Sequence, residues 1–331
     1  MSTSNAMILA GDIGGTTTRL GLFHRASDRP RPVTVRTFPT LEHDDLTSIL
    51  SAFAADPAVN GAEVEAACFG VAGPVSGNCA ELTNASPPWA IETRTIGEAL
   101  GIRRVSLVND VQALAYAVPV LLANELAVLQ EGDARQGGHV ALLAAGTGLG
   151  ESILYAIDGK LVPVASEGGH ADFAARTERE IDALRDLIQR FGHAPVEQVV
   201  SGRGLVNLHR LTHVGPCLAI EDEHAPGAPA AIARAALERR CRGCVDALGM
   251  FVDAYGSEAG NLALRAMATG GVFVGGGIAP KILPALLDGR FVRAFVDKAP
   301  PFGEMLAKIP IKVILNDEAG LLGAAVYAAA M

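Results

Sequence analysis

The chain has 331 residues, half of them hydrophobic and 19% charged, which predicts a folded protein of two domains and excludes a disordered chain. Its formal net charge of −9 at pH 7 would repel a phosphate backbone, so nucleic acid is excluded as an expected partner. The apolar runs end well before the roughly 18 residues of a membrane span, and residues 1–7 do not have the pattern of a signal peptide, so we expect a cytoplasmic protein with no membrane partner.

The first predicted element is a β-hairpin. An apolar run leads into Gly11-Asp12-Ile13, the chain reverses at Gly14-Gly15, and apolar residues alternate again at Leu20 and Leu22. Glycines have no Cβ atom, so an anion can approach the N–H groups of such a turn closely. The turn is therefore a candidate phosphate-binding loop, although a turn of this composition can also do no more than close a hairpin.

Side chains next to this turn suit a metal-bound phosphate. Thr16 and Thr17 offer hydroxyl donors, and Asp12 offers a carboxylate of the kind that binds Mg²⁺ through water. The segment is not a Walker A loop, because the G-x-x-x-x-G-K-[ST] pattern is missing. It is not a dinucleotide-binding fingerprint either, because a strand rather than a helix follows the glycines.

Strands and helices then alternate, which indicates an α/β sheet. We expect a strand over residues 33–38, a helix over 44–55 and a strand over 64–74. Residues 82–89 come next and end in Trp89, the sole tryptophan. Read from their composition, these residues form a Pro-fixed surface loop with the indole packed on the core.

A strand over residues 105–108 runs into Asn109-Asp110, and a helix is expected from Val111. A carboxylate at the carboxyl end of a strand occupies the position where α/β sheets bind ligands. Asn and Asp are also strong helix N-caps, so capping alone would account for both residues. The sequence by itself leaves these two interpretations open.

The second half of the chain opens with another hairpin of the same plan. Pro119 and the polar segment 130–138 place the domain hinge near residues 117–120. An apolar strand from His139 then reaches Gly146-Thr147-Gly148, and a second strand follows. Two such hairpins suggest a duplicated architecture in which both loops face one nucleotide.

Further along, Glu167 and His170 flank two glycines, so both side chains can converge on one small polar ligand. A carboxylate acceptor with an imidazole donor suits the vicinal diols of a sugar better than it suits a metal ion. A capped helix is expected over residues 177–191. Glu197 follows it and, on its own, would be an ordinary solvated residue.

Two groups of His and Cys in this half are spaced like metal ligands. Cys241 and Cys244 lie in a helical pattern over residues 230–255, and no further pair of ligands follows them, so we expect two half-buried helix cysteines. The whole helical region extends over residues 230–267, and a strand that ends in three glycines follows it at 271–277.

The second group, His209, His213 and Cys217, follows one helix face. Pro216 interrupts that helix before Cys217, so we expect no metal there. All five cysteines of the chain are expected to be reduced, because the chain shows no export signal.

Taken together, the motifs resemble those of bacterial glucokinases in order and spacing, over nearly the whole chain. The segments that carry the resemblance are Gly11–Thr16, Leu107–Asp110, Ala145–Gly150, Glu167–His170, Ser201–Leu208, Gly270–Ile278 and Gly320–Gly323. The resemblance implies an α/β fold of two duplicated actin-like ATPase (ribonuclease H-like) domains with a cleft between them. The small domain would comprise residues 1–118 and 318–331, and the large domain residues 119–317.

The activity that this resemblance implies is ATP-dependent phosphorylation of the glucose 6-hydroxyl, a glycolytic reaction, with MgATP as the donor. It implies that Asp110 is the general base, that Asn109 positions the sugar, and that Asp12 binds Mg²⁺ through water. Implied sugar-binding residues are Asn84, Asn109, Asp110, Glu167, His170 and Glu197. Implied nucleotide-binding residues are Gly11, Asp12, Ile13, Gly14, Gly15, Thr16, Gly146, Thr147, Gly148, Gly275 and Gly276. The expected partners are glucose and ATP, and the expected assembly is a homodimer.

Two departures from the family pattern affect this interpretation. The family commonly has Asn-Ala where this chain has Thr17-Thr18, and Trp89 follows Asn84 after four intervening residues rather than two. One alternative is another hexose or amino-sugar kinase of the same fold, including the repressor-ORF-kinase (ROK) group, whose members usually carry a zinc-binding cysteine cluster. The other is a catalytically weak sugar-sensing homologue, which would be expected to lose catalytic carboxylates that this chain retains.

Overall fold

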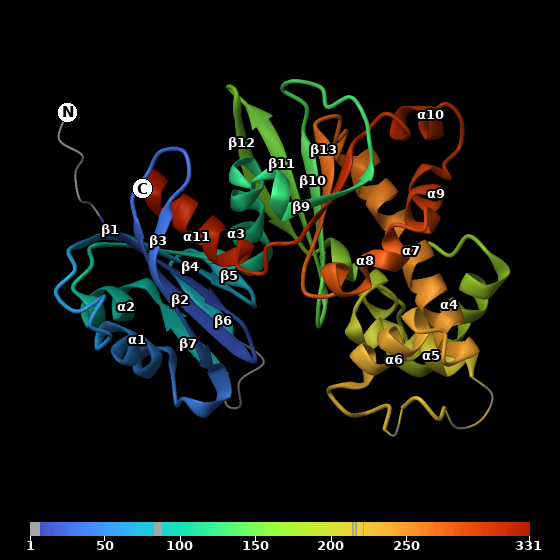
Figure 1. Cartoon of the computed structure of the whole chain (residues 1–331), viewed down its shortest axis with the longest axis horizontal. Helices are drawn as coiled ribbons and strands as arrows, with labels where there is room; N and C mark the ends of the chain where they lie inside the picture. The colour runs from blue at the N-terminus through green and yellow to red at the C-terminus, as the bar shows by residue number, and fades with distance from the viewer. Residues whose placement is uncertain (1–6, 83–87, 214, 216, 221) are drawn as a thin grey trace. The chain divides into compact units, whose positions relative to one another are not determined.

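The computed structural model describes residues 7–82, 88–213, 215, 217–220 and 222–331. Its internal contacts divide the chain into two units, Met1–Leu122 with Asn316–Met331 and Ala123–Leu315. The sequence analysis predicts these boundaries at residues 118 and 318, within four residues of those in the structure. Each unit contains its own large sheet and is described by itself (Figure 1).

The first unit is built on a five-stranded sheet of order β3-β2-β1-β4-β8. Its strands are β1 (Met7–Ile13), β2 (Thr17–His24), β3 (Arg31–Pro39), β4 (Val64–Val71) and β8 (Arg104–Asn109). Strands β1, β2 and β3 pair antiparallel, whereas β4 and β8 run parallel to β1. The hairpin predicted around Gly14-Gly15 is confirmed.

Helices cover both faces of this sheet because successive β1 side chains point to opposite sides. Leu9 and Ile13 pack in one buried cluster with α1 (Leu46–Ala54) and α2 (Thr93–Leu100). Ile8 and Ala10 pack in another with α3 (Asp110–Ala117) and α11 (Ala319–Ala330). Helix α11 therefore belongs to the first unit, although it is the last element of the chain (Figure 1).

A small sheet of β5 (Val75–Ser76), β6 (Cys79–Leu82) and β7 (Trp89–Glu92) completes the first unit. Trp89 is buried and opens β7, so this end of the segment predicted as a surface loop is a strand. Asn84, an expected sugar ligand, lies outside the described residues.

The second unit contains a six-stranded sheet of order β12-β11-β10-β13-β14-β9. Its strands are β9 (Leu126–Gln130), β10 (Val140–Ala145), β11 (Leu149–Ile157), β12 (Lys160–Ser166), β13 (Gly271–Gly275) and β14 (Ile311–Ile314). Strands β10, β11 and β12 pair antiparallel, and β13 and β14 run parallel to β10. The first five strands in this order repeat the directions seen in the first unit, and β9 adds an antiparallel edge.

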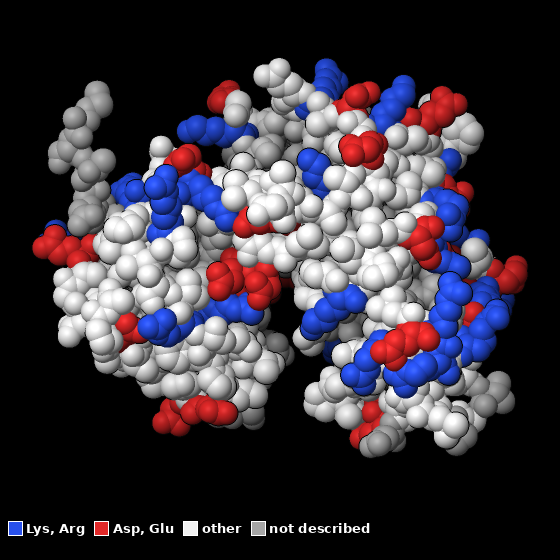
Figure 2. Space-filling view, in the orientation of Figure 1, with Lys and Arg blue, Asp and Glu red and all other residues white. Residues whose placement is uncertain are grey.

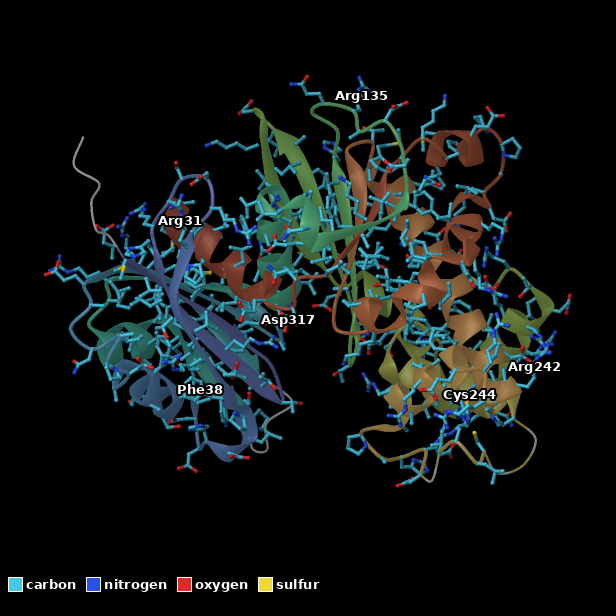
Figure 3. All side chains as sticks on the ribbon, in the orientation of Figure 1. Arg31, Phe38, Arg135, Arg242, Cys244 and Asp317 are labelled. Atoms are coloured by element: carbon cyan, nitrogen blue, oxygen red, sulfur yellow. The ribbon has the colours of Figure 1, made fainter. Side chains whose placement is uncertain are left out.

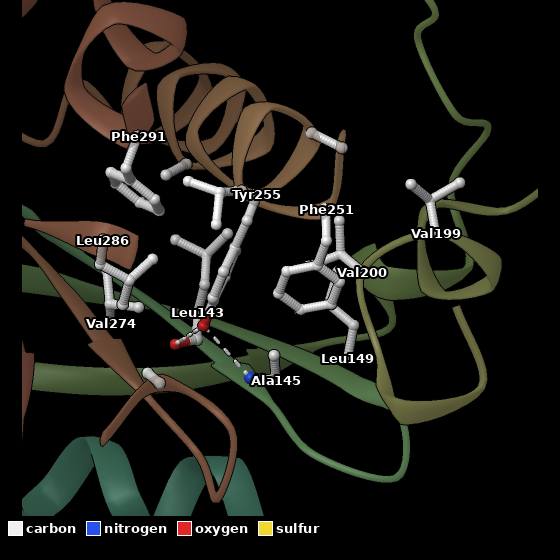
Figure 4. Packing of buried hydrophobic residues seen from close by; sticks show 14 of the residues in the cluster. Leu143, Ala145, Leu149, Val199, Val200, Phe251, Tyr255, Val274, Leu286 and Phe291 are labelled. Atoms are coloured by element: carbon white, nitrogen blue, oxygen red, sulfur yellow. Dashed lines mark hydrogen bonds between the residues drawn. The ribbon is translucent and has the colours of Figure 1, made fainter. Parts of the chain in front are cut away.

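The helices of this unit are α4 (Glu178–Phe191), α5 (Gly202–Thr212), α6 (Ala228–Leu237), α7 (Arg242–Ala266), α8 (Leu283–Leu286), α9 (Arg290–Val296) and α10 (Phe302–Leu306). Tyr255 of α7 is fully buried between the rings of Phe251 and Phe291 (Figure 4). Its hydroxyl accepts a hydrogen bond from the Ala145 N–H at 3.3 Å and lies 3.4 Å from the Gly275 carbonyl. Tyr255 thus joins the carboxyl ends of β10 and β13.

The helical region expected over residues 230–267 contains a break that the sequence did not indicate. It is two helices, because Arg239 adopts a left-handed backbone with φ 54° between α6 and α7. No Gly or Pro marks this break, so the apolar periodicity runs through it. Cys241 is consequently the N-cap of α7 rather than a helix residue, whereas Cys244 is buried in its first turn.

Among the described residues, no helix has the length and apolarity needed to cross a bilayer. On the face drawn in Figure 2, basic and acidic side chains lie next to one another over α4 and α7. Ion pairs such as Arg185–Asp182 and Arg242–Asp246 account for this mixture.

Candidate functional site

In the first unit, three parallel strands bring the predicted nucleotide turn and the predicted base to one edge of the sheet. Asp12 of β1 is in register with Gly70 of β4, and Val71 of β4 is in register with Asn109 of β8. Only one strand therefore separates Asp12 from Asp110, a spacing of about 10 Å between the outer backbones. Asp12 and Asp110 thus lie at the carboxyl edge of the same sheet.

Gly70 of β4 allows the start of α3 to pack closely against the sheet. A Cβ atom on Gly70 would lie 2.8 Å from the Ala113 Cβ and 3.6 Å from the Asp110 Cα. Real Cβ contacts essentially never fall below 3.0 Å, so any side chain here would push the start of α3 away. The position of Asp110 therefore depends on a glycine in the neighbouring strand.

The turn between β1 and β2 is held by a residue that the sequence analysis did not identify, Thr40. Its hydroxyl donates to the Gly14 carbonyl at 2.8 Å, and its N–H donates to the Thr16 carbonyl at 2.9 Å. The hydroxyls of Thr40 and Thr18 lie 2.9 Å apart, and both residues are fully buried. Thr18, one of the departures from the family pattern, is thus part of the support of the turn.

Asp12 is the candidate metal-binding carboxylate of this turn. Burial raises the pKa of the Asp12 carboxyl above its usual value, and Arg19, its cross-strand partner, opposes that shift. A Cβ atom on Gly320 in α11 would lie 3.2 Å from a carboxylate oxygen of Asp12. A partly buried carboxylate whose charge Arg19 stabilises only in part fits a hard cation such as Mg²⁺.

Asn109 and Asp110 begin α3. The Asn109 side chain accepts hydrogen bonds from the N–H groups of Val111 at 3.0 Å and Gln112 at 3.4 Å, so Asn109 is the N-cap. Asp110 accepts from the Val111 N–H at 2.9 Å through one of its two oxygens. Capping therefore explains the orientation of Asn109, while Asp110 is the first residue of the helix at the carboxyl end of β8.

In the second unit, the predicted Gly146–Gly148 hairpin is confirmed. The Gly146 N–H donates to the Gly148 carbonyl at 2.8 Å, and the Gly146 carbonyl accepts from the Gly202 N–H at 2.8 Å. Gly202 is the first residue of α5, so this helix start is attached directly to the turn.

Glu197 packs beneath the same hairpin. One carboxylate oxygen accepts from the Leu149 N–H at 3.0 Å, and the other pairs with Arg203 at 2.8 Å. A Cβ atom on Gly148 would lie 2.3 Å from the first of these oxygens, so glycine is required there. The Glu197 side chain is only 13% exposed, and the interpretation of it as an ordinary solvated residue is wrong.

Glu167 is the N-cap and His170 the last residue of a short 3₁₀ turn, Gly168–His170, beside this hairpin. The Glu167 carboxylate and the His170 Nε2 are 3.8 Å apart, and both side chains are exposed. The Val196 N–H donates to the Ala171 carbonyl at 2.8 Å, which ties this turn to the segment that carries Glu197. The three expected sugar-binding residues of the second unit thus lie on neighbouring segments.

The glycines after β13 lie against the end of β10. Gly276 has φ +82°, and a Cβ atom there would meet the Ala145 carbonyl oxygen at 2.3 Å. The Ile278 N–H donates to the same carbonyl at 3.1 Å. Gly275 and Gly276 therefore lie next to the Gly146 turn.

A buried carboxyl under the Glu167 segment was not predicted. Glu151 of β11 is 1% exposed, and its Oε1 has no hydrogen-bond partner among the described residues. Burial, and next the nearby Glu258, raise the pKa of Glu151 to about 8, while Arg265 lowers it. A Cβ atom on Gly168 would lie 2.1 Å from the Glu151 carboxylate, so Glu151 packs directly against this turn. No local pattern in the sequence indicates this contact.

Comparison with known proteins agrees with the sequence motifs. The profile of the Glucokinase family matches residues 9–331. The glucokinase of Nostoc sp. strain PCC 7120 is 37% identical over 98% of this chain and 99% of its own length. The crystal structure of a glucokinase from an Antarctic psychrotroph superposes with a TM-score of 0.83 at 29% identity, covering 98% of this chain and 99% of that one.

A more distant structure shares the fold. The ROK family glucokinase from Streptomyces griseus, solved in complex with glucose and AMPPNP, has a TM-score of 0.64 at 20% identity. The alignment covers 98% of this chain and all of that one.

Proposed function

This chain belongs to the glucokinase family and phosphorylates glucose with ATP, and we propose that its two glycine hairpins bind the phosphates while Asp110 activates the sugar. The observation that carries this proposal is the shared sheet edge of Asp12 and Asp110. At that edge Asp12 and Asp110 lie about two strand spacings apart, which supports their serving one phosphoryl transfer.

The phosphates are bound mainly by backbone N–H groups. The proposed nucleotide residues are Gly11 to Thr16 of the first unit, Gly146 to Gly148 of the second, and Gly275 and Gly276 beside the adenosine. Asp12 would hold Mg²⁺ through water, and the ion would supply positive charge near the phosphate oxygens. The buried Thr40 and Tyr255 keep the two turns in place before ATP arrives.

The sugar is bound by carboxylate, amide and imidazole groups that together match its hydroxyls. We assign this role to Asn84, Asn109, Glu167, His170 and Glu197. Asp110 accepts the proton of the 6-hydroxyl while that oxygen attacks the γ-phosphorus of ATP, and ADP leaves. Most of the catalysis then comes from alignment of the two substrates.

Both units contribute residues to this one reaction, so we propose that they enclose glucose in a cleft and come together when it binds. Closure would exclude water, the competing acceptor. Small-angle scattering at saturating glucose should show a smaller radius of gyration than the free protein, and an unchanged value would contradict closure. A homodimer remains a prediction, which light scattering after size-exclusion chromatography measures.

Asp110→Asn tests the assignment of the base. We expect turnover, measured as ADP release with glucose, to fall by about 100-fold or more, with glucose affinity changed only several-fold. Asp44→Asn, at an exposed position outside the site, is the matched control and should leave both values unchanged. Near-normal turnover of the Asp110 variant would remove it from the base role. A panel of hexoses and amino sugars in the same assay identifies the preferred acceptor.

A further inference from the structure

Five His and Cys side chains of the second unit meet at the end of α5 and the start of α7. His209 and His213 come from the last turn of α5 and its C-cap, Cys217 from the segment that follows, and Cys241 and Cys244 from the N-cap and first turn of α7. The ligand atoms of His209, His213, Cys217 and Cys244 all lie within 4.8 Å of one another. The two groups of ligands that the sequence analysis treated as separate are therefore one cluster, and Cys244 marks its place in Figure 3.

We propose that this cluster is a structural Zn²⁺ site with Cys217, Cys241, Cys244 and His213 as its ligands. Three thiolates and one imidazole form a common ligand set of structural zinc, and thiolates select Zn²⁺ over the hard cation Mg²⁺. The site is separate from the proposed Mg²⁺ site on Asp12, which lies in the first unit. It does not depend on the proposed function.

The sulfur atoms have the spacing of a tetrahedral metal site. The Cys217 Sγ lies 3.7 Å from the Cys241 Sγ and 3.8 Å from the Cys244 Sγ. Two sulfurs bound to one zinc at 2.3 Å with tetrahedral angles are about 3.8 Å apart, whereas a disulfide would bring them to about 2.0 Å. All three cysteines are free, so the sulfurs are available to bind a metal.

His213 is oriented as a metal ligand. Its Nδ1 lies 3.0 Å from the His209 carbonyl oxygen, to which it donates, so the Nε2 carries the lone pair. That Nε2 lies 3.0 Å from the Cys241 Sγ. Gly243 provides the space for the ring, because a Cβ atom there would lie 2.3 Å from the imidazole. The glycine between the two cysteines of α7 thus admits the histidine of α5.

His209 gives an independent indication that the cluster is incomplete without a ligand. It is 5% exposed, and neither ring nitrogen has a hydrogen-bond partner among the described residues. Its ring stacks on that of His213 with the centroids 3.8 Å apart. Leaving such polar atoms buried and unpaired is unfavourable, because they lose the hydrogen bonds that water would provide. A cation bound by the four proposed ligands would attract the nitrogen lone pair of His209. His209 would thus stabilise the bound ion without being one of its ligands.

The site would stabilise helices α5 and α7, of which α5 is attached to the Gly146–Gly148 hairpin. It clamps the C-terminal end of α5 to the N-terminal end of α7, while the first residue of α5, Gly202, is bonded to Gly146. Zinc binding releases the thiol protons and adds its binding free energy to that of the fold. We therefore expect a structural role, visible in stability rather than in the chemistry of the reaction.

The metal content of the full-length protein, expressed with added zinc, is the direct test. Mass spectrometry of the purified protein should find about one zinc per chain. Cys244→Ser and His213→Gln should lower this to less than one-tenth, while Cys79→Ser and His193→Gln, at exposed positions outside the cluster, should keep it. The proposal would be overturned if the purified wild-type protein contained no zinc and also bound none when zinc was added to it.

A second measurement on the wild-type chain avoids variants that fail to fold. Removal of the metal with a chelator should lower the melting temperature by about 5 °C or more, and Zn²⁺ but not Mg²⁺ should restore it. Co²⁺ in place of Zn²⁺ should give the intense near-ultraviolet bands of thiolate-to-cobalt charge transfer. Cys241→Ser should remove about one-third of this intensity, because one of three thiolates is lost. Cobalt spectra without thiolate bands would contradict the assigned ligands.

Discussion

The carboxylate of Glu197 accepts a hydrogen bond from the N–H of Leu149 at 3.0 Å, where the Gly146–Gly148 turn enters β11. The other oxygen of Glu197 pairs with Arg203 on α5. A residue proposed to bind the sugar therefore also supports the turn that we propose binds phosphate. On this proposal, a change in the Glu197 carboxylate should affect the binding of both substrates.

Glu197→Gln should accordingly impair the use of both substrates. Hydrogen bonds to charged groups contribute about 1.5–3 kcal/mol, so we expect the KM for ATP and the KM for glucose each to rise roughly 10-fold. Initial rates of ADP release with each substrate varied in turn give both constants. Glu167→Gln, on the exposed neighbouring segment, is the comparison and should raise only the glucose value. A Glu197 variant with a normal KM for ATP would show that the turn does not need this carboxylate.

Thr40→Val should weaken both the fold and nucleotide binding. The change removes the buried hydroxyl that donates to the Gly14 carbonyl and contacts the Thr18 hydroxyl. Loss of these bonds should lower the free energy of unfolding by about 1–3 kcal/mol and raise the KM for ATP several-fold. Denaturant unfolding measures the first effect and steady-state kinetics the second. Thr37→Val, at an exposed position of β3, is the matched control, and an equal loss in both variants would argue against the specific role of Thr40.

Gly320→Ala should raise the Mg²⁺ concentration needed for half-maximal activity. The new methyl group would lie 3.2 Å from the Asp12 carboxylate, tighter than most real contacts, so the carboxylate must shift. We expect the requirement for Mg²⁺ to increase several-fold when it is titrated at saturating ATP and glucose. Gly227→Ala introduces the same methyl group where no atom lies within 4 Å and should leave the requirement unchanged. An unaltered Mg²⁺ titration for Gly320→Ala would show that Asp12 does not position the ion.

Glu151→Gln should make the protein more stable near neutral pH. The folded-state pKa of Glu151 is raised to about 8 from an ordinary value of 4.5, so the folded chain holds a proton that the unfolded chain releases. The free energy of unfolding of the wild type should therefore fall as the pH rises from 4.5 to 8. At pH 7 the free energy of unfolding of the wild type should be roughly 3 kcal/mol lower than it is below pH 4.5, because of Glu151 alone.

Chemical denaturation of both forms across pH 5 to 8 measures this effect. The Gln variant should lack the part of the slope that Glu151 contributes, and the two curves should converge near pH 5. Parallel curves over this whole range would show that Glu151 titrates normally in the folded protein.

The features that could be predicted from the sequence are those whose structure depends on residues close together in the chain. Both glycine hairpins, the strand that ends at Asn109 and the capped start of α4 were all visible in the sequence. In α4, for example, the Thr177 side chain and Glu180 cap each other across three residues. Such interactions depend on backbone periodicity and on caps, so the order of the residues is enough to reveal them.

Contacts between residues far apart in the chain were decided only by the tertiary structure. Thr40 meets Gly14, Glu151 lies under Gly168, and His213 meets Cys241 across 28 residues. The last contact requires the unmarked break at Arg239, which turns the chain and brings Cys241 to the start of α7. No local pattern encodes these distances, because they follow from how the helices and strands pack against one another.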